Sequence, residues 1–340
     1  MKKIVLILLL NISFLFSEDS FIKICKNPTP EQNITLKAML KIVNKDRLNQ
    51  PTIEFHNPKI CEILDKEFIV IPYLQNANIS DISILKYFPN TPTLNLWNNK
   101  ITDITPLKYL TKLTKLNLSS NKVSKGVESL EKLPLKELSI DITDNIDLKY
   151  IGKIRTLENL SIFHGKNYKE LNNLKNLKYL SLLSVNIKSL CDLKGLQSLE
   201  KLRLFDNNLK SLECIDQFPN LKKLRIERSP ITDLTPLINA DSITDFHFYN
   251  MPVEDISPLA KMKNLHAILF SKTKIKYLSP LKSSKSIKFA EDTREKFIEE
   301  YFNRSLAWCS PKSMKEVRTG KTCLNEDGSL KPWWKRILGL

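Results

Sequence analysis

The chain has 340 residues, of which 42% are apolar, with only 7 glycines and 17 prolines. This length and composition support a large folded core and exclude both a disordered chain and a collagen-like chain. The formal net charge of +16 favours anionic partners, such as acidic proteins, sulfated glycans or lipid headgroups.

Residues 1–20 have the three parts of a secretory signal peptide. Two lysines precede an apolar run from Ile4 to Phe16, which is too short to span a bilayer. We expect residues 1–17 to be removed by cleavage near Ser17; an uncleaved anchor is the alternative. The mature chain is then secreted or held at the cell surface or in a periplasm, which makes nucleic acid a poor candidate for its partner.

Residues 18–68 are expected to cover the beginning of the repeats described next. The stretch TPEQNITLKAMLKIVN predicts a helix with Thr29 as N-cap, Pro30 at the first helical position and Gln32 at the third. Its apolar side chains, Leu36, Met39, Leu40 and Val43, fall on one face. An amphipathic helix at this place indicates an N-terminal cap.

An apolar-x-apolar pair recurs through the middle of the chain with a period of 22 residues. The second residues of the pairs are Leu74, Leu96, Leu118, Ile140, Ile162, Leu182, Leu204, Ile226, Phe248 and Phe270. Only the step from Ile162 to Leu182 differs, at 20 residues. A period of this kind indicates a repeat architecture in which each coil buries its core against its neighbours.

Each coil is predicted to have a short strand, a turn and a second limb. The second limb is apolar, and in four coils it carries a proline, at Pro106, Pro236, Pro258 and Pro280. It is too short for a long helix, so we expect a 3₁₀ or extended conformation. About ten coils over residues 69–289 therefore predict a solenoid with a parallel sheet on its concave face.

The run LNLWNNKITDITPLKYLTKLTKLNLSSNKV resembles the leucine-rich repeats of internalins, bacterial surface and secreted proteins built on 22-residue repeats. The segments ITDITPL, ITDLTPL and VEDISPL carry the D-[IL]-[ST]-P-L element of that family. The resemblance implies a leucine-rich-repeat fold, adhesion or virulence as the function, and turn asparagines that hydrogen-bond the backbone. Those asparagines match Asn99, Asn121 and Asn207, whereas the other turns depart from the pattern.

Residues 290–340 are expected to form a C-terminal cap and tail. DTREKFIEEYF predicts an amphipathic helix, and the basic and aromatic stretch KPWWKRILGL either contacts an anionic membrane surface or packs on the cap. This segment is shorter than the immunoglobulin-like domain that usually follows internalin repeats, and it carries no LPxTG-type sorting motif.

Six cysteines in an exported chain suggest disulfides, and their positions favour three local pairs. The expected pairs are Cys25 with Cys61, Cys191 with Cys214, and Cys309 with Cys323. The middle pair lies on neighbouring coils, where two buried thiols are an equal alternative.

No motif for an enzyme, a cofactor or a metal is present. The chain has neither a GxG loop nor an HExxH or G-x-S-x-G segment. Asp81, Asp103, Asp233 and Asp255 share one repeat position, so they are interpreted as turn caps rather than as catalytic acids. We therefore expect no catalytic residue, no cofactor and no metal.

Function is then expected on the outward side of the sheet. Large apolar residues there are Trp97, Phe163, Tyr179, Leu183, Phe205 and Tyr249, and basic residues beside them are Lys201, Arg203, Lys223 and Arg225. Aromatic and arginine side chains dominate protein interfaces, so the concave face is predicted to bind a protein. With the internalin resemblance, the expected partner is a host surface receptor.

Two other functions remain open. One is a basic module that binds sulfated glycans or anionic envelope polymers, and the other is a structural envelope protein without a host target. Trp97 is separated from the Phe163 to Phe205 region by two coils, so it is either a separate binding residue or covered by the N-terminal cap.

Overall fold

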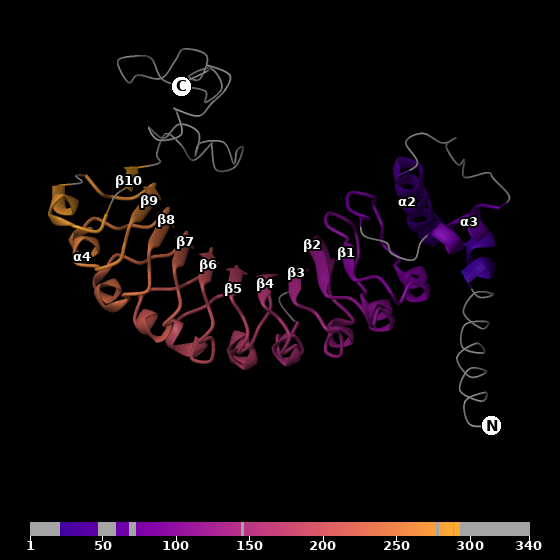
Figure 1. Cartoon of the computed structure of the whole chain (residues 1–340), viewed down its shortest axis with the longest axis horizontal. Coiled ribbons are helices and arrows are strands. Elements are labelled where there is room, and N and C mark those ends of the chain that lie inside the picture. The colour runs from indigo at the N-terminus through magenta and orange to yellow at the C-terminus, as the bar shows by residue number, and fades with distance from the viewer. Residues whose placement is uncertain are drawn as a thin grey trace, which may run out of the picture.

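The computed structural model describes residues 21–46, 59–67, 73–143, 146–276, 279–287 and 289–292. These residues form an arc in which the strands lie on the inner, concave side and short helical turns lie on the outer side (Figure 1). The predicted leucine-rich-repeat solenoid is therefore confirmed. The signal peptide, the predicted C-terminal helix beyond Asp292, the Cys309 and Cys323 pair and the tail lie outside the described residues.

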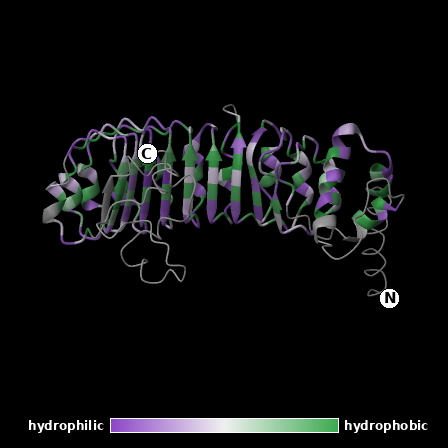
Figure 2. Cartoon of the chain, turned by 90° about the horizontal axis from the view of Figure 1, so that it is seen from above, coloured by the Kyte–Doolittle hydropathy of each residue, from purple (hydrophilic) through white to green (hydrophobic). Residues whose placement is uncertain are grey.

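The strands form one parallel sheet in chain order, from β1 to β10. They are β1 (Thr93–Asn95), β2 (Lys115–Val123), β3 (Glu137–Ile142), β4 (Asn159–Phe163), β5 (Tyr179–Leu183), β6 (Lys201–Phe205), β7 (Lys223–Glu227), β8 (Asp245–Tyr249), β9 (Ala267–Ser271) and β10 (Phe289–Asp292). Seen from above, the strands lie side by side and apolar and polar residues alternate along them (Figure 2).

Pairing follows the 22-residue period, so equivalent residues of successive coils stand next to one another. Leu118 pairs with Ile140, and Ile140 pairs with Ile162, and all three side chains are fully buried. The shorter step before Leu182 is absorbed without loss of register, because Ile162 pairs directly with Leu182. Strand β10 continues the same register, since Phe289 pairs with Ala267, and so carries the sheet into the segment assigned to the C-terminal cap.

The second limbs are short 3₁₀ helices, as the proline-marked pattern predicts. They are η1 (Ser83–Tyr87), η2 (Thr105–Tyr109), η3 (Val127–Leu130), η4 (Ile151–Lys153), η5 (Tyr168–Asn173), η6 (Leu190–Leu193), η7 (Ile215–Gln217), η8 (Thr235–Asn239) and η9 (Ser279–Ser283), with one α-helical turn, α4 (Ser257–Ala260). Their apolar residues, such as Leu107 and Leu237, are fully buried behind the sheet.

The repeated aspartates cap these turns. The carboxylates of Asp103, Asp233 and Asp255 each accept a hydrogen bond of 2.8 Å from the backbone N–H two residues ahead. Thr235 donates to Asp233 from both its hydroxyl and its backbone N–H, and this holds the pKa of Asp233 below its usual 3.8. Ser257 lowers the pKa of Asp255 in the same way. These aspartates act as turn caps in the structure.

The N-terminal cap consists of a helical segment at residues 21–26, α2 (Pro30–Asp46) and α3 (Ile60–Glu67). Thr29 and Gln32 form the predicted capping box, with bonds of 3.1 and 3.2 Å. The Thr35 hydroxyl donates to the carbonyl of Asp81 at 2.7 Å, which attaches α2 to the first coil. None of the helices in the described ranges has the length and apolar character of a membrane span.

Candidate functional site

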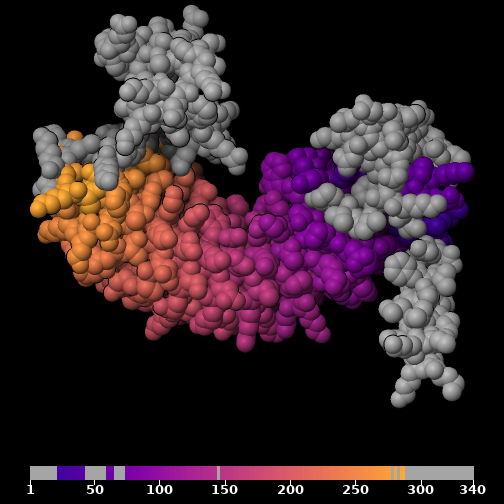
Figure 3. All heavy atoms as spheres, viewed as in Figure 1, coloured from indigo at the N-terminus to yellow at the C-terminus, as the bar shows by residue number. Residues whose placement is uncertain are grey.

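The concave face is lined by the outward side chains of the strands. It is the hollowed inner side of the arc in the space-filling view (Figure 3). In β4 the side chains alternate between partly exposed and buried, with Ile162 buried and Phe163 partly exposed. This alternation agrees with the inward and outward directions expected from the repeat, and it places the predicted side chains of β4 to β7 on one surface.

Phe163, Leu183 and Phe205 stand in one ladder across β4, β5 and β6, because Phe163 pairs with Leu183 and Leu183 pairs with Phe205. We call these three residues the aromatic ridge. The two phenylalanines are partly exposed, whereas Leu183 is only 9% exposed. The expectation of an exposed Leu183 is therefore wrong: the residue faces outward but lies between two large neighbours.

Charged groups flank the aromatic ridge on both sides. On the N-terminal side Asp141 pairs with Phe163, and burial raises the pKa of the Asp141 carboxyl, although His164 and Lys122 act against this. On the C-terminal side the guanidinium of Arg228 lies 4.9 Å from the ring centre of Phe205. The ridge is thus bordered by Asp141 at one end and by Glu227, the ladder partner of Phe205, at the other, with Arg228 over the Phe205 ring.

Arg203 and Arg225 are held by a buried carboxylate that sequence reasoning did not connect to them. Glu227 is 4% exposed, and its Oε1 accepts from Arg203 Nη2 at 3.0 Å and from Arg225 Nε at 2.7 Å. Tyr249 neighbours Glu227 in the sheet, and the Arg225 guanidinium lies 4.9 Å from its ring centre. We call these four residues the arginine cluster.

Two corrections follow from the arginine cluster. Tyr249 was expected to be exposed, but only 3% of it is, because it packs beneath Arg225 and beside Glu227. The basic patch is also less positive than the sequence suggests, since one carboxylate is shared by two arginines. Lys201 and Lys223 are exposed, and Lys223 Nζ lies 3.9 Å from Asp245 Oδ1.

Trp97 and Tyr179 have different surroundings. Trp97 is 41% exposed, so its side chain is accessible. Tyr179 is partly exposed at the start of β5 and lines two hollows of the concave face. One of these contains the side chains of Lys201, Arg203, Lys223 and Arg225. The structure thus brings Tyr179 next to the predicted basic residues and leaves Trp97 apart from them.

The turn asparagines are buried and bridge neighbouring coils. Asn121 Oδ1 accepts from the backbone N–H of Ile101 at 3.0 Å, and its Nδ2 donates to the carbonyls of Leu96 and Leu118 at 3.0 Å. Asn99 and Asn207 make equivalent bonds to the coils before them. Their role in the structure is to satisfy backbone groups that would otherwise be buried without partners.

Two of the three expected disulfides lie within the described residues. Cys25 and Cys61 are bonded and join residues 21–26 to α3. Cys191 and Cys214 are bonded between neighbouring coils, which excludes the alternative of two thiols there.

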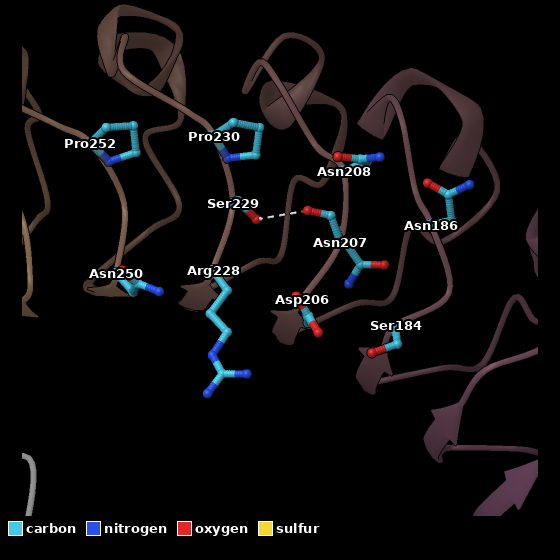
Figure 4. Close-up of a pocket in the computed structure, with 10 residues that line it drawn as sticks. All are labelled: Ser184, Asn186, Asp206, Asn207, Asn208, Arg228, Ser229, Pro230, Asn250 and Pro252. Atoms are coloured by element: carbon cyan, nitrogen blue, oxygen red, sulfur yellow. Dashed lines mark hydrogen bonds between the residues drawn. The ribbon is translucent and has the colours of Figure 1, made fainter.

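A polar hollow of about 630 Å³ at the carboxyl ends of β5 to β8 escaped the sequence analysis. Figure 4 shows its lining from four successive turns, with Ser229 Oγ hydrogen-bonded to the backbone oxygen of Asn207. Arg228 extends from this rim with φ of +52° and reaches the ring of Phe205. The period of the repeat, together with the small polar residues at these turns, is the only sequence feature that points to it.

Within the residues that the structure describes, no group of His, Cys, Asp and Glu side chains has the geometry of a metal site.

Comparisons with known proteins agree with this architecture. A family model described as leucine-rich repeats in two copies matches residues 93–134 and 197–239. The structure is similar to that of an internalin, InlF, from Listeria monocytogenes, with a TM-score of 0.62 and 21% sequence identity over 78% of each chain. It is also similar to a TDR receptor, with a TM-score of 0.53 and 19% identity over 69% of this chain and 45% of the receptor.

A search of curated protein sequences finds no match. At these levels of identity the structural similarities establish the fold. The chain has a leucine-rich-repeat solenoid fold, similar to that of the internalin.

Proposed function

We propose that this chain is an exported protein that binds another protein through its concave face. The observation that carries the proposal is the aromatic ridge beside the arginine cluster, on an open and curved sheet. Partly exposed phenylalanines supply apolar contact area, and arginines fixed in place lose little side-chain entropy on binding. Both are properties of residues that dominate the binding energy of protein interfaces.

The surface gains specificity from the fixed orientation of its charges. Arg203 and Arg225 both bind Glu227 through one nitrogen each, so their remaining N–H groups have defined directions. Arg203 is 37% exposed at its side chain and therefore accessible to a partner. A partner with a carboxylate next to an apolar side chain would complement the cluster and the ridge together.

An extracytoplasmic location is part of the proposal. Disulfides such as Cys25–Cys61 and Cys191–Cys214 persist in oxidising compartments and are rare in the cytosol. The signal peptide expected at residues 1–17 leads to the same location. Together with the internalin-like fold, this supports a bacterial adhesion or virulence factor that recognises a host surface protein and has no enzymatic activity.

Binding of a sulfated glycan or an anionic envelope polymer is the second candidate, and the exposed Lys201 and Lys223 favour it. Against it, Glu227 neutralises part of the charge of Arg203 and Arg225. Salt separates the two functions, because exposed charges are screened at high ionic strength whereas apolar burial is not. A structural envelope protein would bind neither a host protein nor a glycan.

The experiment is a capture of host-cell surface proteins by the exported chain and by two variants. Phe163→Ala/Phe205→Ala removes both rings of the ridge, and Tyr109→Ala removes a side chain that is 47% exposed on the outer side of the arc. We expect one protein to bind wild type and Tyr109→Ala at about 0.5 M salt and to be lost with the double variant. Capture by all three alike, or only at low salt, would contradict the proposal.

A further inference from the structure

A hollow between Tyr73 and Tyr179 lies on the N-terminal half of the concave face. It meets the proposed protein site only at Tyr179, which also lines the neighbouring hollow. It has a volume of about 390 Å³ and runs across β1 to β5. Tyr73 closes one end with 58% of its surface exposed, and Tyr179 closes the other. Its floor is formed by short polar side chains, which are Asn95, Asn117, Ser139, Asn159 and Ser161.

Two of these side chains are already oriented for a ligand. Asn95 Oδ1 accepts from the backbone N–H of Trp97 at 3.1 Å, and Asn117 Oδ1 accepts from that of Ser119 at 3.0 Å. These bonds fix which end of each amide carries the NH₂ group. Within the described ranges neither NH₂ group has an acceptor, so both present two N–H donors at the concave surface.

The hollow is electrically neutral. Lys115 and Glu137 are the charged side chains in its lining, and they bind each other at 2.7 Å across β2 and β3. The neighbouring hollow, by contrast, is lined by four basic side chains and one acidic side chain, Asp245, so its lining carries a net positive charge. An anionic polymer is attracted to that neighbouring hollow, whereas the hollow between Tyr73 and Tyr179 suits a ligand without charge.

The spacing of the donors distinguishes between neutral ligands. Asn95, Asn117 and Ser139 stand on adjacent strands in register, so the groups repeat at about 4.8 Å along the solenoid. An extended peptide advances about 3.3 Å per residue and presents equivalent side chains every 6.7 Å or so, which does not match this spacing. A pyranose ring is about as long as one strand spacing, and its hydroxyls are good acceptors for amide N–H groups.

We infer that this hollow binds a neutral oligosaccharide that lies along the axis of the solenoid. The exposed ring of Tyr73 and the partly exposed ring of Tyr179 stack on the apolar faces of sugar rings at the two ends. Between them the NH₂ groups of Asn95 and Asn117 donate to sugar oxygens. The ligand is a chain of neutral hexoses or N-acetylhexosamines without sulfate or carboxylate groups.

The test measures binding of three neutral hexasaccharides, cellohexaose, chitohexaose and maltohexaose, by calorimetry. A heparin hexasaccharide serves as the anionic comparison. Asn95→Asp/Asn117→Asp keeps the acceptors for Trp97 and Ser119 and removes the NH₂ donors, so the local fold is retained. Phe163→Ala/Phe205→Ala is the control outside the hollow.

We expect at least one neutral hexasaccharide to bind wild type and the phenylalanine variant equally, from about 0.05 to about 0.5 M salt. The asparagine variant should bind it at least about tenfold more weakly, the size of effect expected for lost buried hydrogen bonds. Absence of binding to all three sugars, equal binding by the asparagine variant, or binding of heparin alone would overturn the inference. Loss of a protein partner with the phenylalanine variant is a separate result, so the two proposals fail independently.

Discussion

The turn asparagine Asn121 gives a sharp test of what holds the coils together. Asn121 is 2% exposed and makes one accepted and two donated hydrogen bonds to backbone groups at 3.0 Å, with a longer one of 3.4 Å to the carbonyl of Ser119. Asn121→Ala removes the three short bonds together with the longer one, and it leaves the N–H of Ile101 and the carbonyls of Leu96 and Leu118 without this partner. At roughly 1 kcal/mol or more for each bond, we expect the free energy of unfolding to fall by about 3–4 kcal/mol.

A matched control lies on the same strand. Asn117 is partly exposed, and its Oδ1 accepts from one backbone N–H, that of Ser119, which water can satisfy instead. Asn117→Ala is therefore expected to cost only about 0.5–1 kcal/mol. Urea unfolding followed by circular dichroism measures both losses. Equal losses, or a loss below about 1 kcal/mol for Asn121→Ala, would refute the reasoning from buried backbone groups.

Two further predictions concern charged groups. Glu227→Gln keeps the shape of the side chain but replaces two ion pairs by hydrogen bonds from the charged Arg203 and Arg225 to a neutral amide oxygen. The free energy of unfolding should therefore fall by about 1–2 kcal/mol, and an unchanged urea midpoint would contradict this. The folded pKa values of Asp233 and Asp255 lie below 3.8, so their contribution to stability is complete above that pH and is lost as pH falls through the lowered values. In Asp233→Asn/Asp255→Asn the free energy of unfolding should therefore fall less steeply than in wild type as the pH is lowered below about 4. The same pH dependence in both proteins would show that the ionised carboxylates of these caps do not stabilise the fold.

Much of the fold follows from the sequence because the repeat is regular. The 22-residue period places Leu118, Ile140 and Ile162 in one buried ladder, and the structure has this register. The capping box of Thr29 and Gln32 is equally local, since both partners lie within one helical turn. Features fixed by spacing along the chain were therefore predictable.

The candidate site was less predictable, because exposure depends on neighbours from other coils. The repeat points Leu183 and Tyr249 outward and places Leu183 beside Phe205, but it does not show that both side chains are almost fully covered or that Arg225 packs on the ring of Tyr249. The pairing of Arg203 with Glu227 is diagonal across two strands and 24 residues apart, so no local pattern indicates it. The neutral hollow between Tyr73 and Tyr179 is not predictable from the sequence, because the polar residues that line it are common at these positions of the repeat.

The rings of the aromatic ridge also contribute to the stability of the fold. Phe163 and Phe205 are partly buried, and Arg228 packs on the ring of Phe205, so removing both rings is expected to cost some stability rather than none. A partly buried phenylalanine loses less than the roughly 3–5 kcal/mol typical of a core position. The double variant therefore needs a measured unfolding curve beside every binding experiment.

The central claim, that the concave face binds a protein through the aromatic ridge, is tested most directly by one affinity measurement. The dissociation constant of the captured surface protein is determined for wild type, Phe163→Ala/Phe205→Ala and Tyr109→Ala, each shown to be folded at the assay temperature. Loss of two central anchors predicts an affinity at least about 100-fold weaker for the double variant and unchanged for Tyr109→Ala. Equal affinity of the double variant and wild type would contradict the claim.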